Sequence, residues 1–103
     1  MKIDIKPLSV NKVWQGRRFK TSIYKVYEEE LYYLLPGMEF GDEIKLRIEF
    51  GFSNMRMDID NPVKPLLDVM QKKYGFNDNQ ITQLHLFKKK VKKGKEYIKI
   101  EVL

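Results

Sequence analysis

The sequence predicts a small α+β domain in which two helices pack on a largely antiparallel or mixed sheet. The chain has 103 residues, the size of one domain, so we expect residues 1–103 to form a single unit. Residues 44–52 alternate apolar and charged side chains, as a half-buried strand does. Two segments, near residues 21–35 and 62–74, repeat apolar residues at helical spacing.

The first half of the chain predicts a strand, a loop and a helix before the strand at 44–52. Residues 2–6 alternate charged and apolar side chains and are expected to form a strand, whereas residues 7–21 form a long basic loop. Thr21 or Ser22 is a suitable N-cap for a helix that ends near Leu35. The apolar residues at helical spacing in it are Ile23, Tyr27, Leu31 and Leu34.

The second half predicts a polar connection, a helix and two strands. Residues 53–60 continue the strand as an irregular polar segment, and a helix follows over 62–74. Its apolar face carries Leu66, Leu67, Met70 and Tyr74, and Gly75 occupies the expected left-handed position at its end. Strands are expected at 80–90 and 96–102, joined by a hairpin turn at 92–95. The predicted order is therefore β-α-β-α-β-β.

The composition excludes several chemistries. There is no cysteine, so disulfides, thiolate nucleophiles and cysteine-bound zinc are excluded, and the single histidine, His85, cannot form a cluster. A hard cation held by carboxylates is the metal chemistry that remains. No apolar run approaches the roughly 20 residues of a membrane span, and the first residues lack the apolar core of a signal peptide. We therefore expect an intracellular protein without a membrane partner.

The charge suits a polyanionic partner. The formal net charge is +6 and the pI is about 9.5. Six lysines fall within residues 88–95, and a second basic cluster spans residues 12–25. Lysine runs also occur on solvated hairpins, and Trp14 and Phe19 either stack on unpaired bases or pack inside the protein. The predicted DNA contacts are Lys12, Arg17, Arg18, Lys20, Arg56, Lys88, Lys89, Lys90, Lys92 and Lys93.

Asp58 and Asp60 are the first candidates for catalysis. Two residues apart in an extended stretch, their carboxylates project to one side and repel each other unless a cation lies between them. Asn61 and Pro62 suit the N-cap and first position of a helix. Lys64 then lies near a helix N-terminus, where phosphate binding is favoured.

The same residues also occur as ordinary helix caps. Pro65 further biases Lys64 away from helical geometry. A third carboxylate, Asp78, and the two basic clusters favour a magnesium site over a simple cap.

The combined motif resembles one family. Segment 58–68 reads D-I-D-N-P-V-K-P-L-L-D, and segment 77–80 reads N-D-N-Q. The RusA-type Holliday-junction resolvases have D-x-D-N-x-x-K, an apolar helix with an internal aspartate, and then D-D-x-Q before a strand. The sequence is similar to this family over nearly its whole length, including P-L-S-V-N at 7–11. It departs from the pattern at Asn77, which replaces the first acid of the second motif; its effect on metal binding is an open question.

The resemblance implies a catalytic site and its cofactor. Asp58, Asp60 and Asp78 would hold Mg²⁺, with Mn²⁺ as a substitute, and Lys64 would be the essential basic residue. Asn61 and Asp68 are supporting positions. Asp68, four residues after Lys64 on a helix, either orients that lysine or binds the metal directly.

The resemblance also implies the substrate and the assembly. It implies a homodimer that binds branched DNA, especially four-way junctions, and hydrolyses phosphodiesters by paired nicks without a small-molecule cofactor. A bacterial or phage gene acting in the host cytoplasm is the family expectation. The alternatives are a non-catalytic DNA- or RNA-binding module and a basic scaffold whose acids only cap a helix.

One geometric question is open. The helix at 62–74 is about 15–20 Å long, whereas the loop before Asp78 reaches back only about 10 Å. Either this loop folds back sharply to bring Asp78 near Asp58 and Asp60, or Asp78 completes the site of a partner subunit.

Overall fold

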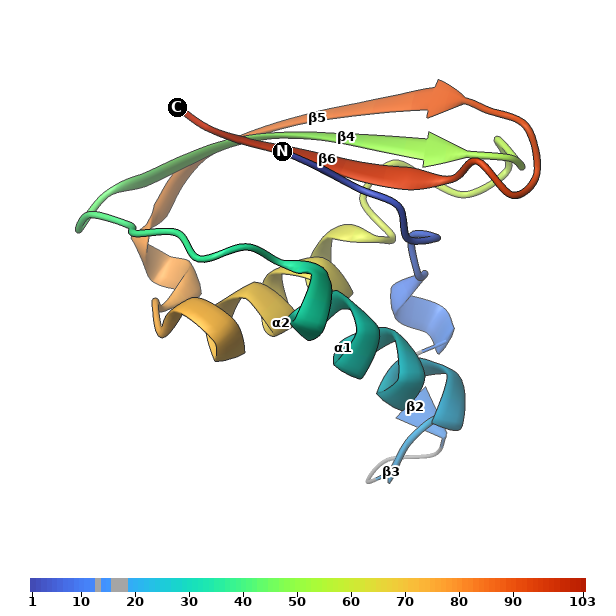
Figure 1. Cartoon of the computed structure of the whole chain (residues 1–103), viewed down its shortest axis with the longest axis horizontal. Helices are drawn as coiled ribbons and strands as arrows, with labels where there is room; N and C mark the ends of the chain where they lie inside the picture. The colour runs from blue at the N-terminus through green and yellow to red at the C-terminus, as the bar shows by residue number, and fades with distance from the viewer. Residues whose placement is uncertain (13, 16–18) are drawn as a thin grey trace.

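A four-stranded sheet and two helices form two layers in this computed structural model, which describes residues 1–12, 14–15 and 19–103 (Figure 1). Arg17 and Arg18, two predicted DNA contacts, lie outside the described residues, as do the side chains of Trp14 and Phe19. The elements are β1 (Lys2–Ile3), the 3-10 turn η1 (Val10–Lys12), β2 (Trp14–Gln15), β3 (Phe19–Lys20), α1 (Ser22–Leu34), β4 (Ile44–Phe52), α2 (Val63–Tyr74), the 3-10 turn η2 (Asp78–Gln80), β5 (Ile81–Lys90) and β6 (Tyr97–Val102).

Strand β4 is at the centre of the main sheet, whose strand order is β1-β6-β4-β5. It pairs antiparallel with β6 on one side and parallel with β5 on the other, and β6 pairs antiparallel with β1. The parallel pair is connected through α2, as a parallel pair requires. The sheet is therefore mixed, which confirms the predicted α+β class.

The predicted hairpin between the last two strands is wrong, because β4 lies between them. The crossover through α2 places β5 beside β4 in the parallel direction. The chain after β5 then passes the end of β4, where the Val91 amide donates to the Phe52 carbonyl at 2.8 Å. Strand β6 consequently takes the opposite edge of β4, and residues 92–95 form part of a connection between non-adjacent strands.

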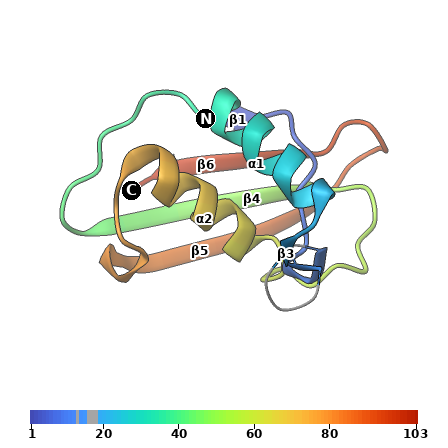
Figure 2. The same cartoon turned by 90° about the horizontal axis from the view of Figure 1, so that it is seen from below.

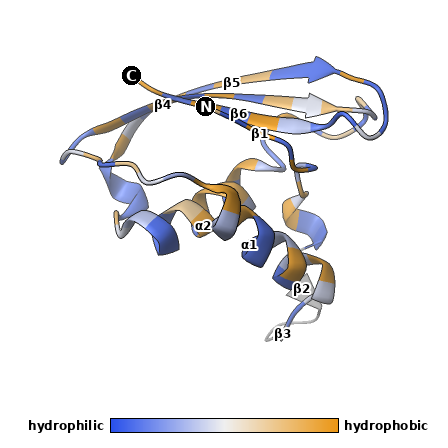
Figure 3. Ribbon diagram, in the orientation of Figure 1, coloured by the Kyte–Doolittle hydropathy of each residue, from blue (hydrophilic) through white to orange (hydrophobic). Residues whose placement is uncertain are grey.

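Both helices cover the same face of the sheet (Figures 1 and 2). Buried residues of β4 alternate with half-buried ones along most of the strand, and its apolar side chains share one core with those of the two helices. Figure 3 shows the apolar residues of α1 and α2 as orange segments of their ribbons. The opposite face is polar, with Arg47 paired with Glu101 at 3.6 Å and its guanidinium 4.2 Å from the Phe87 ring centre.

No helix of the described residues is long and apolar enough to cross a membrane.

Helix α1 forms where the sequence predicts it, and two of its four predicted core positions are buried. The Thr21 hydroxyl caps it by accepting a hydrogen bond from the Tyr24 amide at 3.1 Å. The buried side chains are those of Tyr24, Tyr27, Leu31 and Leu35, at spacings of three and four residues. Ile23 and Leu34, predicted on the buried face, are 56% and 40% exposed. Tyr27 and Leu31 are buried as predicted, whereas Tyr24 and Leu35 are buried in place of the predicted Ile23 and Leu34.

The first strand is shorter than predicted. Only Lys2 and Ile3 pair with β6, against a predicted strand over residues 2–6. A hydrogen bond of 2.9 Å from the Ile5 amide to the Ile3 carbonyl turns the chain there. Ile5 is nevertheless buried, so the predicted alternation reflects burial rather than strand pairing.

Candidate active site

The connection between β4 and α2 carries Asp58 and Asp60, and it consists of turns. The Asn61 amide donates to the Asp58 carbonyl at 3.1 Å, and the Val63 amide donates to the Asp60 carbonyl at 3.1 Å. The predicted extended conformation of residues 58–60 is therefore wrong, because these backbone bonds close two successive turns. Both carboxylates are exposed, and within the described part of the chain neither has a hydrogen bond or ion pair.

Helix α2 begins one residue later than predicted. Pro62 occupies the N-cap position, and no side chain caps the helix. Asn61 does not act as the predicted N-cap: its amide donates within the preceding turn, and its carbonyl accepts from the Val10 amide at 2.9 Å rather than from an amide of the helix. This bond ties the aspartate turns to the N-terminal segment. Lys64 lies in the first turn of the helix despite the proline that follows it.

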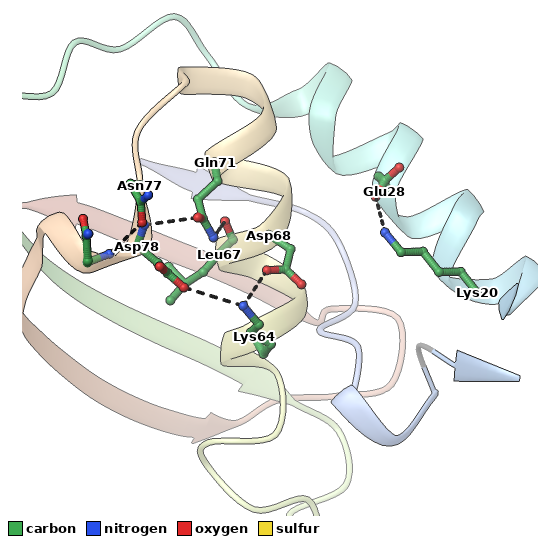
Figure 4. Close-up of polar contacts among 9 residues, drawn as sticks. Lys20, Glu28, Lys64, Leu67, Asp68, Gln71, Asn77 and Asp78 are labelled. Carbon is green, nitrogen blue, oxygen red and sulfur yellow. Dashed lines mark hydrogen bonds and ion pairs between the residues drawn. The ribbon is translucent and has the colours of Figure 1, made fainter. Parts of the chain in front are cut away.

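The chain reverses after α2 and returns Asp78 to the helix. Gly75 has a φ of 75°, the left-handed conformation expected there. Asn77 and Gln80 form a reciprocal capping box on η2. The Asp78 amide then donates to the Gln71 side-chain oxygen at 3.1 Å, while the Gln71 amide group donates to the Leu67 carbonyl at 3.3 Å (Figure 4). Gln71 thus fixes the Asp78 backbone against its own helix.

Lys64 lies between two carboxylates. Its ammonium is 2.9 Å from Asp68 Oδ1, one helical turn away, and 3.7 Å from Asp78 Oδ2 (Figure 4). The hydrogen bond to Asp68 is the largest influence raising the pKa of Lys64, and the charge of Asp78 acts in the same direction. Lys64 is therefore held as a cation. The contact expected if Asp68 orients Lys64 is present, and Asp78 meets Lys64 within one chain.

A hollow opens beside Asp78. Its volume is about 310 Å³, and the residues that line it are Leu67, Asp78, Ile81, Thr82, Gln83 and Leu84. The carboxylate therefore lies at an open surface that an extended polymer can approach, rather than in a closed cavity for a small molecule.

The donors suit a hard divalent cation. Three exposed carboxylates supply oxygen ligands, and Mg²⁺ keeps several waters, so a few such ligands are sufficient. Within residues 1–12, 14–15 and 19–103, no group of three or more acids or histidines is assembled for a metal. The positive charge beside Asp78 is that of Lys64. The chemistry of the donors fits the ion, while the three-carboxylate cluster is not formed in this arrangement.

The predicted DNA contacts differ in their surroundings. Lys20 is 3.8 Å from Glu28 of α1, and Lys88 donates to the carbonyls of Met55 and Met57. The side chains that are exposed are those of Lys12, Arg56, Lys89, Lys90, Lys92 and Lys93. Four of these lie at the end of β5 or in the connection after it, at the same end of the sheet as the aspartate turns (Figure 2).

Sequence reasoning missed Gln71, because nothing in its spacing marks it. If Asp78 holds a metal ion, as the family resemblance implies, we expect Gln71→Leu to raise the divalent-metal concentration needed for half-maximal DNA cutting by about 10–100-fold, because Asp78 loses its backbone anchor. Gln71→Glu keeps an acceptor oxygen for the Asp78 amide, so its half-maximal metal concentration should be closer to that of the native protein than the value for Gln71→Leu. A metal titration of the cutting rate measures this, with DNA binding in EDTA as the control. An unchanged titration for Gln71→Leu would contradict the anchoring role.

Comparison with known proteins identifies the family. A family model described as Endodeoxyribonuclease RusA matches residues 9–102, a range that is nearly the whole chain and contains the candidate catalytic residues. A comparison with curated proteins finds no match. The chain therefore belongs to the RusA family of endodeoxyribonucleases, enzymes that hydrolyse DNA and resolve Holliday junctions.

Proposed function

We propose that this chain acts as a Mg²⁺-dependent homodimer that resolves four-way DNA junctions by paired nicks, in the cytoplasm of a bacterial host. The observation that carries the proposal is the position of Lys64. It follows Asp60 by four residues, and its ammonium is 3.7 Å from Asp78, which comes from beyond the other end of α2. A basic residue that follows the first acidic segment in sequence thus contacts the second, in a family whose members cut DNA.

Asp58, Asp60 and Asp78 are the proposed metal ligands, and Mn²⁺ is the proposed substitute ion. Mg²⁺ supplies a Lewis acid and an activated water at neutral pH. Lys64 supports this role as a fixed cation placed to stabilise negative charge on the phosphate or the leaving oxygen. Asp68 holds the lysine by its 2.9 Å contact, which reduces the freedom of a long side chain.

The exposed lysines are proposed to hold the DNA backbone. Lys89, Lys90, Lys92 and Lys93 are exposed at the end of the sheet that also carries the aspartate turns, and the proposal is that a duplex arm passes over them. Phosphate contacts of this kind position a nucleic acid without reading its sequence. Lys12 and Arg56 are the proposed contacts nearer the turns, and they would add to the same electrostatic attraction.

Two symmetric nicks need two sites, which supports a homodimer with a two-fold axis. The exposed face of α1 supports a self-contact, because Ile23, Val26 and Tyr33 are 56%, 62% and 84% exposed. These residues recur at spacings of three and seven along one side of the helix. Exposed apolar side chains gathered on one helix face are typical of protein interfaces.

The decisive experiment is cutting of a synthetic four-way junction with each strand labelled in turn. We expect no cutting in EDTA, paired nicks with Mg²⁺ or Mn²⁺, and none with Asp60→Asn, although this variant should still bind the junction. Binding by the native protein without cutting in any divalent cation would overturn the proposed reaction. Cutting of a linear duplex as fast as the junction would overturn the proposed selectivity.

A further inference from the structure

Lys88 occupies a position on β5 that faces the helices. In the parallel register, Lys88 lies beside Phe50 of β4, as Leu86 lies beside Ile48. Phe50 and Ile48 are buried under the helices, and neighbouring residues of paired strands share a face. Lys88 is thus half-buried on the inner side, where an apolar residue is usual, whereas Lys89 and Lys90 are exposed.

The ammonium of Lys88 is bonded to the aspartate turns. It donates to the Met55 carbonyl at 3.2 Å and to the Met57 carbonyl at 3.1 Å. Met57 directly precedes Asp58. Two of the three N–H groups of this lysine therefore bond to backbone carbonyls of residues 55–57, directly before Asp58.

The neighbouring lysines do not make hydrogen bonds of the kind that Lys88 makes within the described residues. Across the described stretches of the chain, the side chains of Lys89, Lys90, Lys92 and Lys93 have no hydrogen bond or ion pair. A phosphate could be bound by any of them at little structural cost. Lys88 has only one N–H group left for a phosphate, and moving its ammonium out to a DNA backbone would leave the Met55 and Met57 carbonyls in need of other donors.

We propose that Lys88 is a positioning residue of the nuclease site, which fixes residues 55–57 so that Asp58 and Asp60 are presented to the metal. This inference rests on the proposed function, and it replaces DNA contact as the role of this lysine. Groups that orient metal ligands contribute substantially to metal affinity although they do not touch the ion. Lys88 and the Val10–Asn61 backbone bond hold the two sides of the same turns.

The first arm of the test needs neither metal nor DNA. Hydrogen exchange of amides in residues 53–62 is compared in the native protein, Lys88→Met and the matched exposed variant Lys89→Met. We expect exchange at least about tenfold faster in Lys88→Met and unchanged in Lys89→Met, because only the first loses bonds to the turns. Lys88→Arg retains a cation with several donors and should restore protection. Equal exchange in the native protein and Lys88→Met would overturn the proposal.

The second arm separates positioning from DNA contact. Mn²⁺ affinity, measured by calorimetry, should fall about 10–100-fold in Lys88→Met and remain unchanged in Lys89→Met. The salt dependence of junction binding in EDTA should keep its slope in Lys88→Met. A slope reduced by about one, with native Mn²⁺ affinity, would identify Lys88 as a phosphate contact and overturn the proposal.

These measurements also distinguish this proposal from the proposed function. Failure of the native protein to cut DNA would overturn the function, while exchange and Mn²⁺ binding would still decide the role of Lys88. If Lys88→Met does not fold, Lys88→Gln, which keeps a polar side chain at this half-buried position, is put through the same two arms.

Discussion

Asp78→Asn is expected to slow junction cutting by on the order of a thousandfold, about 4 kcal/mol of transition-state stabilisation. The physical reason is that the amide removes both the charge of a proposed metal ligand and the carboxylate 3.7 Å from Lys64. Single-turnover cutting of a labelled junction at saturating Mg²⁺ measures the loss. Glu39→Gln, which also neutralises an exposed acid, is the matched control and should cut at the native rate. A loss of less than about tenfold for Asp78→Asn would contradict a metal-ligand role.

Mixing two inactive variants determines whether one chain completes the site. If the acids of a site come from two subunits, a heterodimer of Asp58→Asn and Asp78→Asn contains one intact site and cutting returns. If they come from one chain, both sites of the heterodimer are damaged. Because Asp78 meets Lys64 within a chain, we expect no restored cutting. Restoration to a substantial fraction of native activity would show that the acids are shared.

Phe50→Ala is expected to cost about 3–5 kcal/mol of the free energy of unfolding. Phe50 is fully buried in the central strand, and its ring is stacked on that of Phe52 at 5.9 Å between centres. A domain of this size has only about 5–15 kcal/mol of total stability, so the melting temperature should fall by more than about 10 °C. Thermal unfolding followed by circular dichroism measures it.

Substitution of an exposed aromatic residue is the control, because it removes a ring of similar size without removing buried surface. Tyr33→Ala removes a ring that is 84% exposed, and in dilute protein, where the proposed α1 self-contact is dissociated, it should change stability by no more than about 0.5 kcal/mol. A fall in melting temperature for Phe50→Ala as small as that for Tyr33→Ala would contradict the central position of β4 in the core.

The local elements were predictable from the sequence because their signals are local. The alternation over 44–52, the Thr21 cap and the Gly75 stop each lie within a few residues of the element they define. Strand order has no such signal: the alternation of β5 and β6 shows their faces but not their neighbours. The predicted hairpin followed from their closeness in sequence, whereas the crossover through α2 had already placed β5 beside β4.

The sequence motif proposes which residues form the candidate site, but it does not contain the geometry of that site. The motif names Asp58, Asp60, Lys64 and Asp78, but the return of Asp78 depends on the left-handed Gly75 and on the Gln71 anchor. The turns around Asp58 depend on backbone bonds and on Lys88, which lies about thirty residues further along the chain. Such contacts join distant segments, so periodicity and spacing contain no trace of them.

The central position of β4 has a consequence for how the chain folds. Both strands that pair with it are made after it, and β1 pairs only with β6, so Lys2 must meet Lys99 across nearly the whole sequence. Closing loops of this length costs chain entropy before the contacts are gained. We therefore expect β4, α2 and β5 to assemble early and β1 to join last. The segment that ties down the aspartate turns through Val10 would then be among the final parts to dock, so that a competent site marks the completion of folding.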